Sequence, residues 1–269
     1  MPINRREFLK LAGLAGLTGL GGKAAFDLLL PGQAEASLKN LPLTEGRKWG
    51  MVIDMTRMNE EIMEACIKAC HTIHNVPQWV DKSDPEWETK PEARWQIKWI
   101  WEETYEHSFP GQENEYAPAK YHHHNFLLLC NHCTNPPCCR ACPTKATFKR
   151  KIDGIVMMDY HRCIGCRFCM AACPYGSRSF NWRDPRPFVP DVREDFPTRM
   201  RGVVEKCTFC SERLMKGLLP ACVEACKAKA LVFGDLEDPD SEVRKILREN
   251  YAIRRKPELG TMPQIYYLV

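Results

Sequence analysis

Cysteines in short, regular runs constrain this chain more than any other feature. Of its 269 residues, 15 are cysteines. The most regular run is Cys163-x2-Cys166-x2-Cys169-x3-Cys173-Pro174. In this spacing a tight loop places three thiolates around one 4Fe-4S cube, while the fourth thiolate ligates a different cluster. Cysteine chemistry is therefore expected to dominate the fold.

Three further runs share parts of this spacing. Two of them have four cysteines each: Cys130-x2-Cys133-x4-Cys138-x3-Cys142-Pro143 and Cys207-x2-Cys210-x11-Cys222-x3-Cys226. The remaining run is incomplete, because Cys66-x3-Cys70 has Glu60 and Met63 where two more cysteines would stand. Methionine is a poor ligand for this cluster, and a carboxylate is harder than the usual thiolate. The cluster of the incomplete run is therefore predicted to be absent.

Other cysteine and histidine chemistries remain as alternatives. A four-thiolate zinc site could use the run from Cys207 to Cys226, although the two ferredoxin-type runs favour iron and sulfide. An odd cysteine count argues against a disulfide framework. The segment Cys66–His71 is one residue too long for a C-x-x-C-H haem site. For 122–124 and His132 we expect a solvated loop or hydrogen bonds to a cluster sulfur rather than metal ligation.

Residues 1–36 have the features of a twin-arginine export signal. They contain Asn4-Arg5-Arg6-Glu7-Phe8-Leu9-Lys10, a weakly apolar stretch over 11–22 and the small-residue pattern Ala34-Glu35-Ala36. A membrane anchor is the alternative, but Lys23 and Asp27 interrupt the apolar run before the roughly 20 residues that a span requires. The formal net charge of +4 is small and predicts no nucleic-acid partner.

The remaining sequence predicts an α+β fold of short elements. After a linker at 37–48, the pattern predicts a strand at 49–55 and a helix at 60–74. Asp153-Gly154 indicates a hairpin within 148–159, and an apolar run follows at 231–233. Residues 78–124 form a cysteine-free insert rich in Trp and Tyr, which we interpret as packing or interface residues. A Pro-rich connector at 184–202 and a C-terminal extension at 241–269, with a basic helix at 244–255 and an extended end, complete the chain.

An internal repeat indicates two copies of one module. Gly50-Met51-Val52-Ile53-Asp54 is similar to Gly154-Ile155-Val156-Met157-Met158-Asp159, and each string leads into a cysteine run that ends in C-x3-C. The repeat predicts two pseudo-symmetric modules of the bacterial ferredoxin type. One module combines 49–77 with 203–240, and the other covers 125–183.

From residue 49 onward the chain resembles the ferredoxin-like electron-transfer subunits of membrane-bound respiratory complexes. This family includes the iron-sulfur subunits of nitrate, polysulfide and dimethyl sulfoxide reductases. The resemblance is carried by the cysteine runs and by these strings: Asn75-Val76-Pro77, Cys173-Pro174-Tyr175-Gly176, Cys207-Thr208-Phe209-Cys210, Pro220-Ala221-Cys222-Val223-Glu224 and Gly234-Asp235. Lys227 departs from the family pattern, in which proline follows the last cysteine.

The resemblance implies crossed ligation of three 4Fe-4S clusters by twelve cysteines. The first set is Cys130, Cys133, Cys138 and Cys173; the second is Cys142, Cys163, Cys166 and Cys169; the third is Cys70, Cys207, Cys210 and Cys222. Cys66, Cys139 and Cys226 are left without a cluster. Each oxidised cube with four thiolates carries a charge of about −2. We expect basic residues near the runs to balance this charge: Arg140, Lys145, Arg162, Arg167 and Arg178.

The resemblance also implies a non-catalytic electron carrier with no substrate site of its own. Among its relatives, the incomplete run favours the exported iron-sulfur subunit of the sulfite-reduction-associated complex. The expected partners are a multihaem cytochrome c and a polytopic quinone-interacting membrane subunit, at the periplasmic or extracytoplasmic face of the membrane. Two alternatives are the iron-sulfur subunit of an exported molybdenum reductase and a zinc-stapled structural module.

Overall fold

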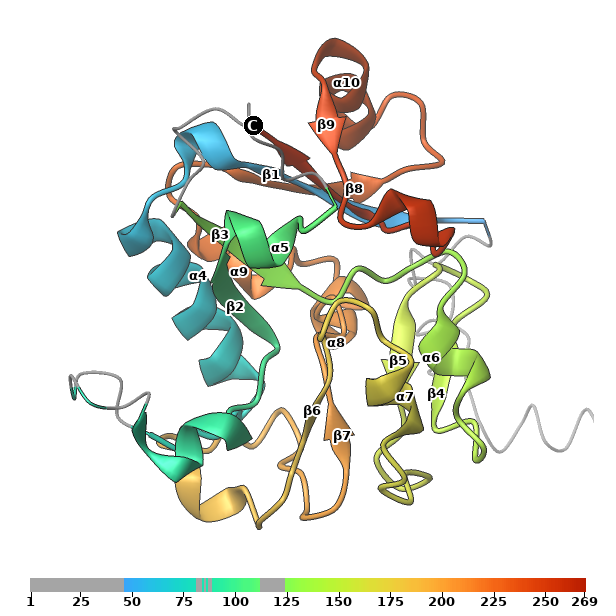
Figure 1. Cartoon of the computed structure of the whole chain (residues 1–269). Helices are drawn as coiled ribbons and strands as arrows, with labels where there is room; N and C mark the ends of the chain where they lie inside the picture. Colours follow the sequence, from blue (N-terminus) through green and yellow to red (C-terminus); the bar gives the residue numbers. More distant parts are fainter. Residues whose placement is uncertain (1–45, 81–83, 85, 87–88, 112–123) are drawn as a thin grey trace, which may run out of the picture. The chain divides into compact units, whose positions relative to one another are not determined.

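The computed structural model describes residues 46–80, 84, 86, 89–111 and 124–269 (Figure 1). The predicted export signal at 1–36, most of the linker at 37–48, and Trp87, Tyr116 and Tyr121 lie outside the described residues. Within the described ranges, no helix combines the length and the apolar character that crossing a bilayer requires. The described part mixes short helices with small sheets, which confirms the α+β class.

A four-stranded sheet joins the two ends of the described chain. Its strand order is β8 (Leu231–Asp235), β1 (Trp49–Asp54), β10 (Ile265–Leu268) and β9 (Ala252–Ile253). Strand β1 pairs antiparallel with β8 and parallel with β10, so that Val52 lies opposite both Val232 and Tyr266. The predicted strand at 49–55, the apolar run and the extended C-terminal end are thus neighbours in one sheet.

Helix α4 (Glu60–Ile73) lies against α9 (Ala221–Ala225) and brings the incomplete cysteine run to the last run. The Asn59 side chain caps its first turn by accepting the Ile62 N–H at 2.9 Å. The buried face consists of Met63, Cys66 and Cys70, at the helical spacing that the sequence predicts.

Three two-stranded sheets and several single-turn helices hold the loops. The paired strands are β2 (Ile100–Thr104) with β3 (Asn125–Leu129), β4 (Thr147–Lys149) with β5 (Val156–Met158), and β6 (Ser179–Phe180) with β7 (Val204–Glu205). The short helices are α5 (Tyr105–Ser108), α6 (Pro137–Arg140), α7 (Phe168–Ala171) and α8 (Ser211–Leu214). The 3-10 turns are η1 (Met55–Arg57), η3 (Pro91–Trp95), η5 (Arg186–Phe188) and η6 (Pro257–Leu259). The predicted hairpin is confirmed, with Gly154 at a φ of +72° in its turn.

The basic helix of the C-terminal extension differs from the prediction. Helix α10 covers Glu242–Glu249, starts earlier and ends before 255. The Ser241 hydroxyl caps it by accepting the Arg244 N–H at 3.4 Å. Asn250 is extended, and the chain then pairs with β10 as strand β9. Pairing in the sheet therefore overrides the helical pattern at Ala252 and Ile253.

The aromatic insert supplies core. Trp79, Trp99, Trp101 and Tyr105 are buried, in agreement with the packing interpretation. The indole N–H of Trp99 donates to Glu205 Oε2 at 2.9 Å. Glu205 in turn forms a fully buried ion pair with Arg199 at 2.7 Å. The insert is thereby fixed to the segment that leads into the last cysteine run.

Candidate metal centres

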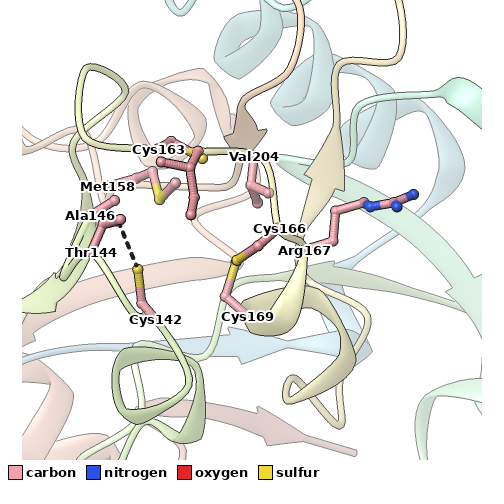
Figure 2. A pocket seen from close by; sticks show the side chains of 10 residues that line it. Cys142, Thr144, Ala146, Met158, Cys163, Cys166, Arg167, Cys169 and Val204 are labelled. Atoms are coloured by element: carbon pink, nitrogen blue, oxygen red, sulfur yellow. Dashed lines mark hydrogen bonds between the residues drawn. The ribbon is translucent and has the colours of Figure 1, made fainter.

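Four cysteines of the predicted second set surround one small pocket, which Figure 2 shows from close by. Cys142 follows α6, Cys163 and Cys166 lie on the loop after β5, and Cys169 lies in α7. Two left-handed residues turn the loop, Gly165 with φ +71° and Arg167 with φ +62°. Cys163 and Cys166 are half-buried, so this site opens to the surface.

Hydrogen bonds prepare Cys142 to be a thiolate. The Thr147 N–H donates to Cys142 Sγ at 3.4 Å, and the Thr144 hydroxyl lies 3.7 Å from the same sulfur (Figure 2). Burial raises the pKa of Cys142, but these hydrogen bonds outweigh it and lower the pKa below its ordinary value. N–H groups directed at a sulfur are the means by which a protein holds and tunes an iron-sulfur ligand.

The structure also brings together the cysteines of the predicted first set. Burial and the nearby thiols of Cys130, Cys138 and Cys173 together raise the pKa of Cys133 to about 12. Cys130, Cys133 and Cys138 are buried, whereas Cys173 is half-buried. The fourth member arrives from a different run, as crossed ligation requires.

The predicted third set is the most deeply buried. Cys70 on α4 faces the run from Cys207 to Cys222, and all four cysteines are buried. Burial raises the pKa of Cys70 well above its ordinary value, and Cys210, Cys207 and Cys222 add to the rise. The amides of Phe209 and Ala221 donate to Cys207 Sγ and Cys210 Sγ, each at 3.4 Å.

The three leftover cysteines lie outside these sets. Cys66 and Cys226 contact each other: burial, followed by the charge and hydrogen bond of Cys226, raises the pKa of Cys66 to about 12. Cys226 Sγ also accepts the Ala230 N–H at 3.3 Å. Cys139 shares a hydrogen bond with Cys138 that raises the pKa of Cys139. All 15 cysteines are free thiols in the structure.

Two buried cations show that these sites suit a negatively charged group. Arg178 is only 5% exposed, and its Nη2 has no hydrogen-bond partner within the described structure. Lys206 is 0% exposed, and its Nζ donates to the carbonyl oxygens of Val156 and Cys207. Within the described ranges, neither side chain forms an ion pair with a carboxylate.

An unpaired buried charge costs several kcal/mol, so each cation requires an anion nearby. Burial lowers the pKa of Arg178, but the charges of Cys138, Cys169, Cys130 and Cys173 together outweigh it and raise the pKa above its ordinary value. Arg178 therefore lies between the first and the second set. Clusters of about −2 charge at these sets would supply the missing anions, so the residues fit the predicted cofactor.

The spacing of the thiols favours cubes over single zinc ions. Four thiolates around one zinc ion, with Zn–S bonds of about 2.3 Å, lie about 3.8 Å from one another. Within the described ranges, three ligand atoms converge within 4.8 Å only at His74, Cys210 and Glu212. The cysteine sets are more open, as thiolates on separate irons of one cube are.

Two histidines have roles that the sequence only partly indicated. His132 is buried between the first and third sets, where its ring stacks on Phe209 with centroids 3.7 Å apart. Its Nδ1 accepts the Val156 N–H at 3.1 Å, so the expectation of a solvated loop is wrong for this residue. His74 was not predicted. It lies one turn after Cys70 and contacts Glu212 Oε1 at 3.1 Å and the Cys70 carbonyl oxygen at 2.8 Å.

Only one of the five basic residues expected to balance cluster charge is buried. Arg140, Lys145, Arg162 and Arg167 are exposed, although Arg167 also lines the pocket of the second set, and Arg178 is buried among the thiols. Lys206 was missed, although its position directly before Cys207 was a usable signal.

Comparison with known proteins decides the family. The sequence model of the 4Fe-4S dicluster domain matches residues 122–186 and 193–236, which contain all of the cysteines except Cys66 and Cys70. The Hdr-like menaquinol oxidoreductase iron-sulfur subunit 1 of Archaeoglobus fulgidus is 39% identical over 290 residues, 98% of this chain and 97% of the relative. The chain belongs to the 4Fe-4S dicluster family.

Two further relatives support this family membership. The menaquinone reductase iron-sulfur cluster-binding subunit of Nitratidesulfovibrio vulgaris is 36% identical over 82% of this chain and 88% of its own length. Protein NrfC of Escherichia coli is 33% identical over 99% of this chain and 95% of its own length. The predicted family is confirmed. The chain is an iron-sulfur electron-transfer protein that carries 4Fe-4S clusters.

Proposed function

We propose that this protein is a non-catalytic electron-transfer subunit with three 4Fe-4S clusters, one on each of the three cysteine sets. A 4Fe-4S cube accepts and releases single electrons, so neighbouring cubes form a conducting row. The proposal rests on the neighbourhood of the sets. Arg178 is close to thiols of both the second and the first set, and Cys207 of the third set is close to Cys130 of the first. This order makes the first cluster the middle of the row.

The two ferredoxin-like modules are part of the same proposal. Pairing of β1 with β8 supports a module of 49–77 with 203–240, and the β4–β5 hairpin supports a module at 125–183. The insert at 78–124, the connector at 184–202 and the extension at 241–269 would hold these modules together. The parallel pairing of β10 with β1 gives the extension a structural role in the first module.

The second set is proposed as the end that faces the membrane partner. Exposed apolar side chains lie around it: Ile164 at 67%, Phe168 at 61% and Trp182 at 42%. Such a patch on a protein surface indicates an interaction site. The partner would be a polytopic quinone-interacting membrane subunit, in keeping with the menaquinol and menaquinone complexes named for two relatives.

At the opposite end, the third set would exchange electrons with a multihaem cytochrome c. The two cysteines missing from the incomplete run support a partner different from that of a molybdenum reductase subunit. In our proposal, the contact between Cys66 and Cys226 occupies the place of a fourth cluster. We further propose twin-arginine export to the periplasmic or extracytoplasmic face, in a complex linked to sulfite or sulfate reduction. The iron-sulfur subunit of an exported molybdenum reductase is the second candidate, and a fourth cluster would favour it.

The experiment compares Cys166→Ser with Cys139→Ser in the assembled membrane complex. Cys166→Ser should lose the second cluster and stop electron transfer with menaquinol, because it breaks the proposed membrane end of the row. Cys139→Ser is the matched control and should retain both iron and transfer. Undiminished menaquinol-linked transfer in Cys166→Ser would contradict the proposal.

A further inference from the structure

A hollow of about 480 Å³ lies beside the β4–β5 hairpin, apart from the cysteine sets. Its volume falls within the range of about 300–1,000 Å³ that is typical of ligand sites. Five of its nine lining residues are cationic: Arg47, Lys48, Lys149, Arg150 and Lys151. Glu237 is the single acidic residue in the lining.

Hydrogen bonds of the main chain fix the two basic segments of the hollow, 47–48 and 149–151. The Trp49 N–H donates to the Asp153 carbonyl oxygen at 3.4 Å, which ties the start of β1 to the hairpin turn. The Lys48 N–H donates to Asp235 Oδ1 at 2.9 Å, and the Leu236 N–H donates to the Lys48 carbonyl oxygen at 2.7 Å. The cations are therefore preorganised by the sheet and do not depend on a mobile loop.

Little of this positive charge is neutralised within the chain. Glu237 lies 4.0 Å from Lys48 Nζ and is itself exposed, so it screens weakly. The Lys149 ammonium donates to the Thr134 carbonyl oxygen at 2.9 Å. Burial, and then the charge of Lys48, lowers the pKa of Lys149. Repulsion among these ammonium groups would be relieved by an anion in the hollow.

The cations that remain available in the hollow are ammonium groups. The planar fork of arginine binds carboxylate or phosphate through two hydrogen bonds, whereas the lysine ammonium acts as a point charge. In this hollow both guanidinium groups are already engaged: Arg150 Nε donates to Asp153 Oδ1 at 3.0 Å, and Arg47 lies over the Trp49 ring at 5.6 Å. Lys48, Lys149 and Lys151 are left as three separate point charges.

We propose that this basic hollow binds a segment of a partner protein that carries several carboxylates. Three ammonium groups in an open site of this volume match a row of acidic side chains better than one small oxyanion. The charges of Cys139 and Cys133 act on Lys149, so the segment would dock beside the first set. The inference rests on the proposed function only in taking the partner to be a subunit of the same complex.

The test measures binding of a fluorescein-labelled hexaglutamate peptide to the anaerobically purified, iron-loaded full chain. A hexaglutamine peptide serves as the uncharged control. Wild-type protein should bind hexaglutamate with an affinity that falls as salt rises, and should not bind hexaglutamine. Lys149→Gln with Lys151→Gln should weaken binding about tenfold, as loss of complementary charges does. Lys227→Gln with Lys245→Gln removes two exposed charges outside the hollow and should bind as wild type does.

The proposal would be overturned if hexaglutamate binding were weakened equally in both double variants, or if it were weakened in neither. Competition by millimolar inorganic phosphate, or preferential binding to phosphatidylglycerol vesicles, would also overturn it in favour of a phosphate ligand. Iron and sulfide are measured on the same samples. Normal iron content without peptide binding would reject this site and leave the electron-transfer proposal intact. Missing iron would count against the electron-transfer proposal alone.

Discussion

Arg178 and Lys206 connect single residues to cofactor chemistry. Both are buried cations without a carboxylate partner in the described structure, and the charges of both act on the Cys138 thiol. Burying a charge is costly unless an opposite charge compensates it. The clusters would provide that charge, and the cations would in turn favour the more negative, reduced state of the cubes.

Arg178→Gln is expected to lower the potentials of the first and second clusters. Removal of a buried positive charge destabilises the reduced cube. The reduction potential should fall by on the order of tens of millivolts, and a shift of about 59 mV changes the one-electron equilibrium constant tenfold. A redox titration followed by electron paramagnetic resonance measures the shift. Arg162→Gln is the control, because Arg162 is 67% exposed and paired with Asp159 at 3.3 Å. Equal shifts in both variants would contradict a special role for Arg178.

Cys66 and Cys70 offer a comparison within one helix. Cys70→Ser should reduce the iron content by up to about four per chain, because it removes a proposed ligand of the third cluster. Cys66→Ser should leave the iron content unchanged, since Cys66 contacts Cys226 in the place of a cluster. Iron analysis of the two purified variants distinguishes these results. A loss of four irons in Cys66→Ser would show that a fourth cluster exists.

At the scale of elements, the sequence predicted the helices and hairpins that local patterns encode, but it did not predict the pairing of distant strands. The helix at 60–74 was predictable because its buried positions recur at helical spacing. The β4–β5 hairpin was predictable because Asp153-Gly154 is a typical turn sequence. The parallel pairing of β10 with β1 joins residues more than 200 positions apart, and no local signal encodes it. A separate contact, the pairing of β9 with β10, explains why α10 ends early. Crossed ligation came from the family resemblance, whereas the contacts of His74 required the three-dimensional structure.

The loop before α7 gives a prediction at this scale. Gly165 has a φ of +71°, and a Cβ atom there would lie 2.6 Å from the Gly202 carbonyl oxygen. Gly165→Ala should therefore distort the loop that carries Cys163 and Cys166. The iron content of the protein should fall as a result. Gly176→Ala has a similar cost of about 1–2 kcal/mol for its left-handed backbone, but its added Cβ atom would contact no neighbouring atom.

The measurement is the temperature at which cluster absorbance is lost in each glycine variant. We expect Gly165→Ala to lose absorbance at a clearly lower temperature than Gly176→Ala. Equal temperatures would mean that the close approach to Gly202 does not constrain the second site.

At the scale of the whole molecule, segments far apart in sequence come together around the three cysteine sets that we propose as a row of clusters. In the proposed order, the second set, with three half-buried cysteines, stands at one end and the buried third set at the other. The basic hollow lies beside the middle of this row, so a bound partner would act on the first cluster. In this proposal, the contact between Cys66 and Cys226 marks where the row stops.

The central claim is that three cubes occupy this chain, and metal analysis tests it most directly. Iron, acid-labile sulfide and zinc are measured per chain on anaerobically purified protein. The account predicts about twelve irons with matching sulfide and no stoichiometric zinc. About sixteen irons would restore the fourth cluster and favour a molybdenum reductase complex. Zinc without sulfide would contradict the account altogether.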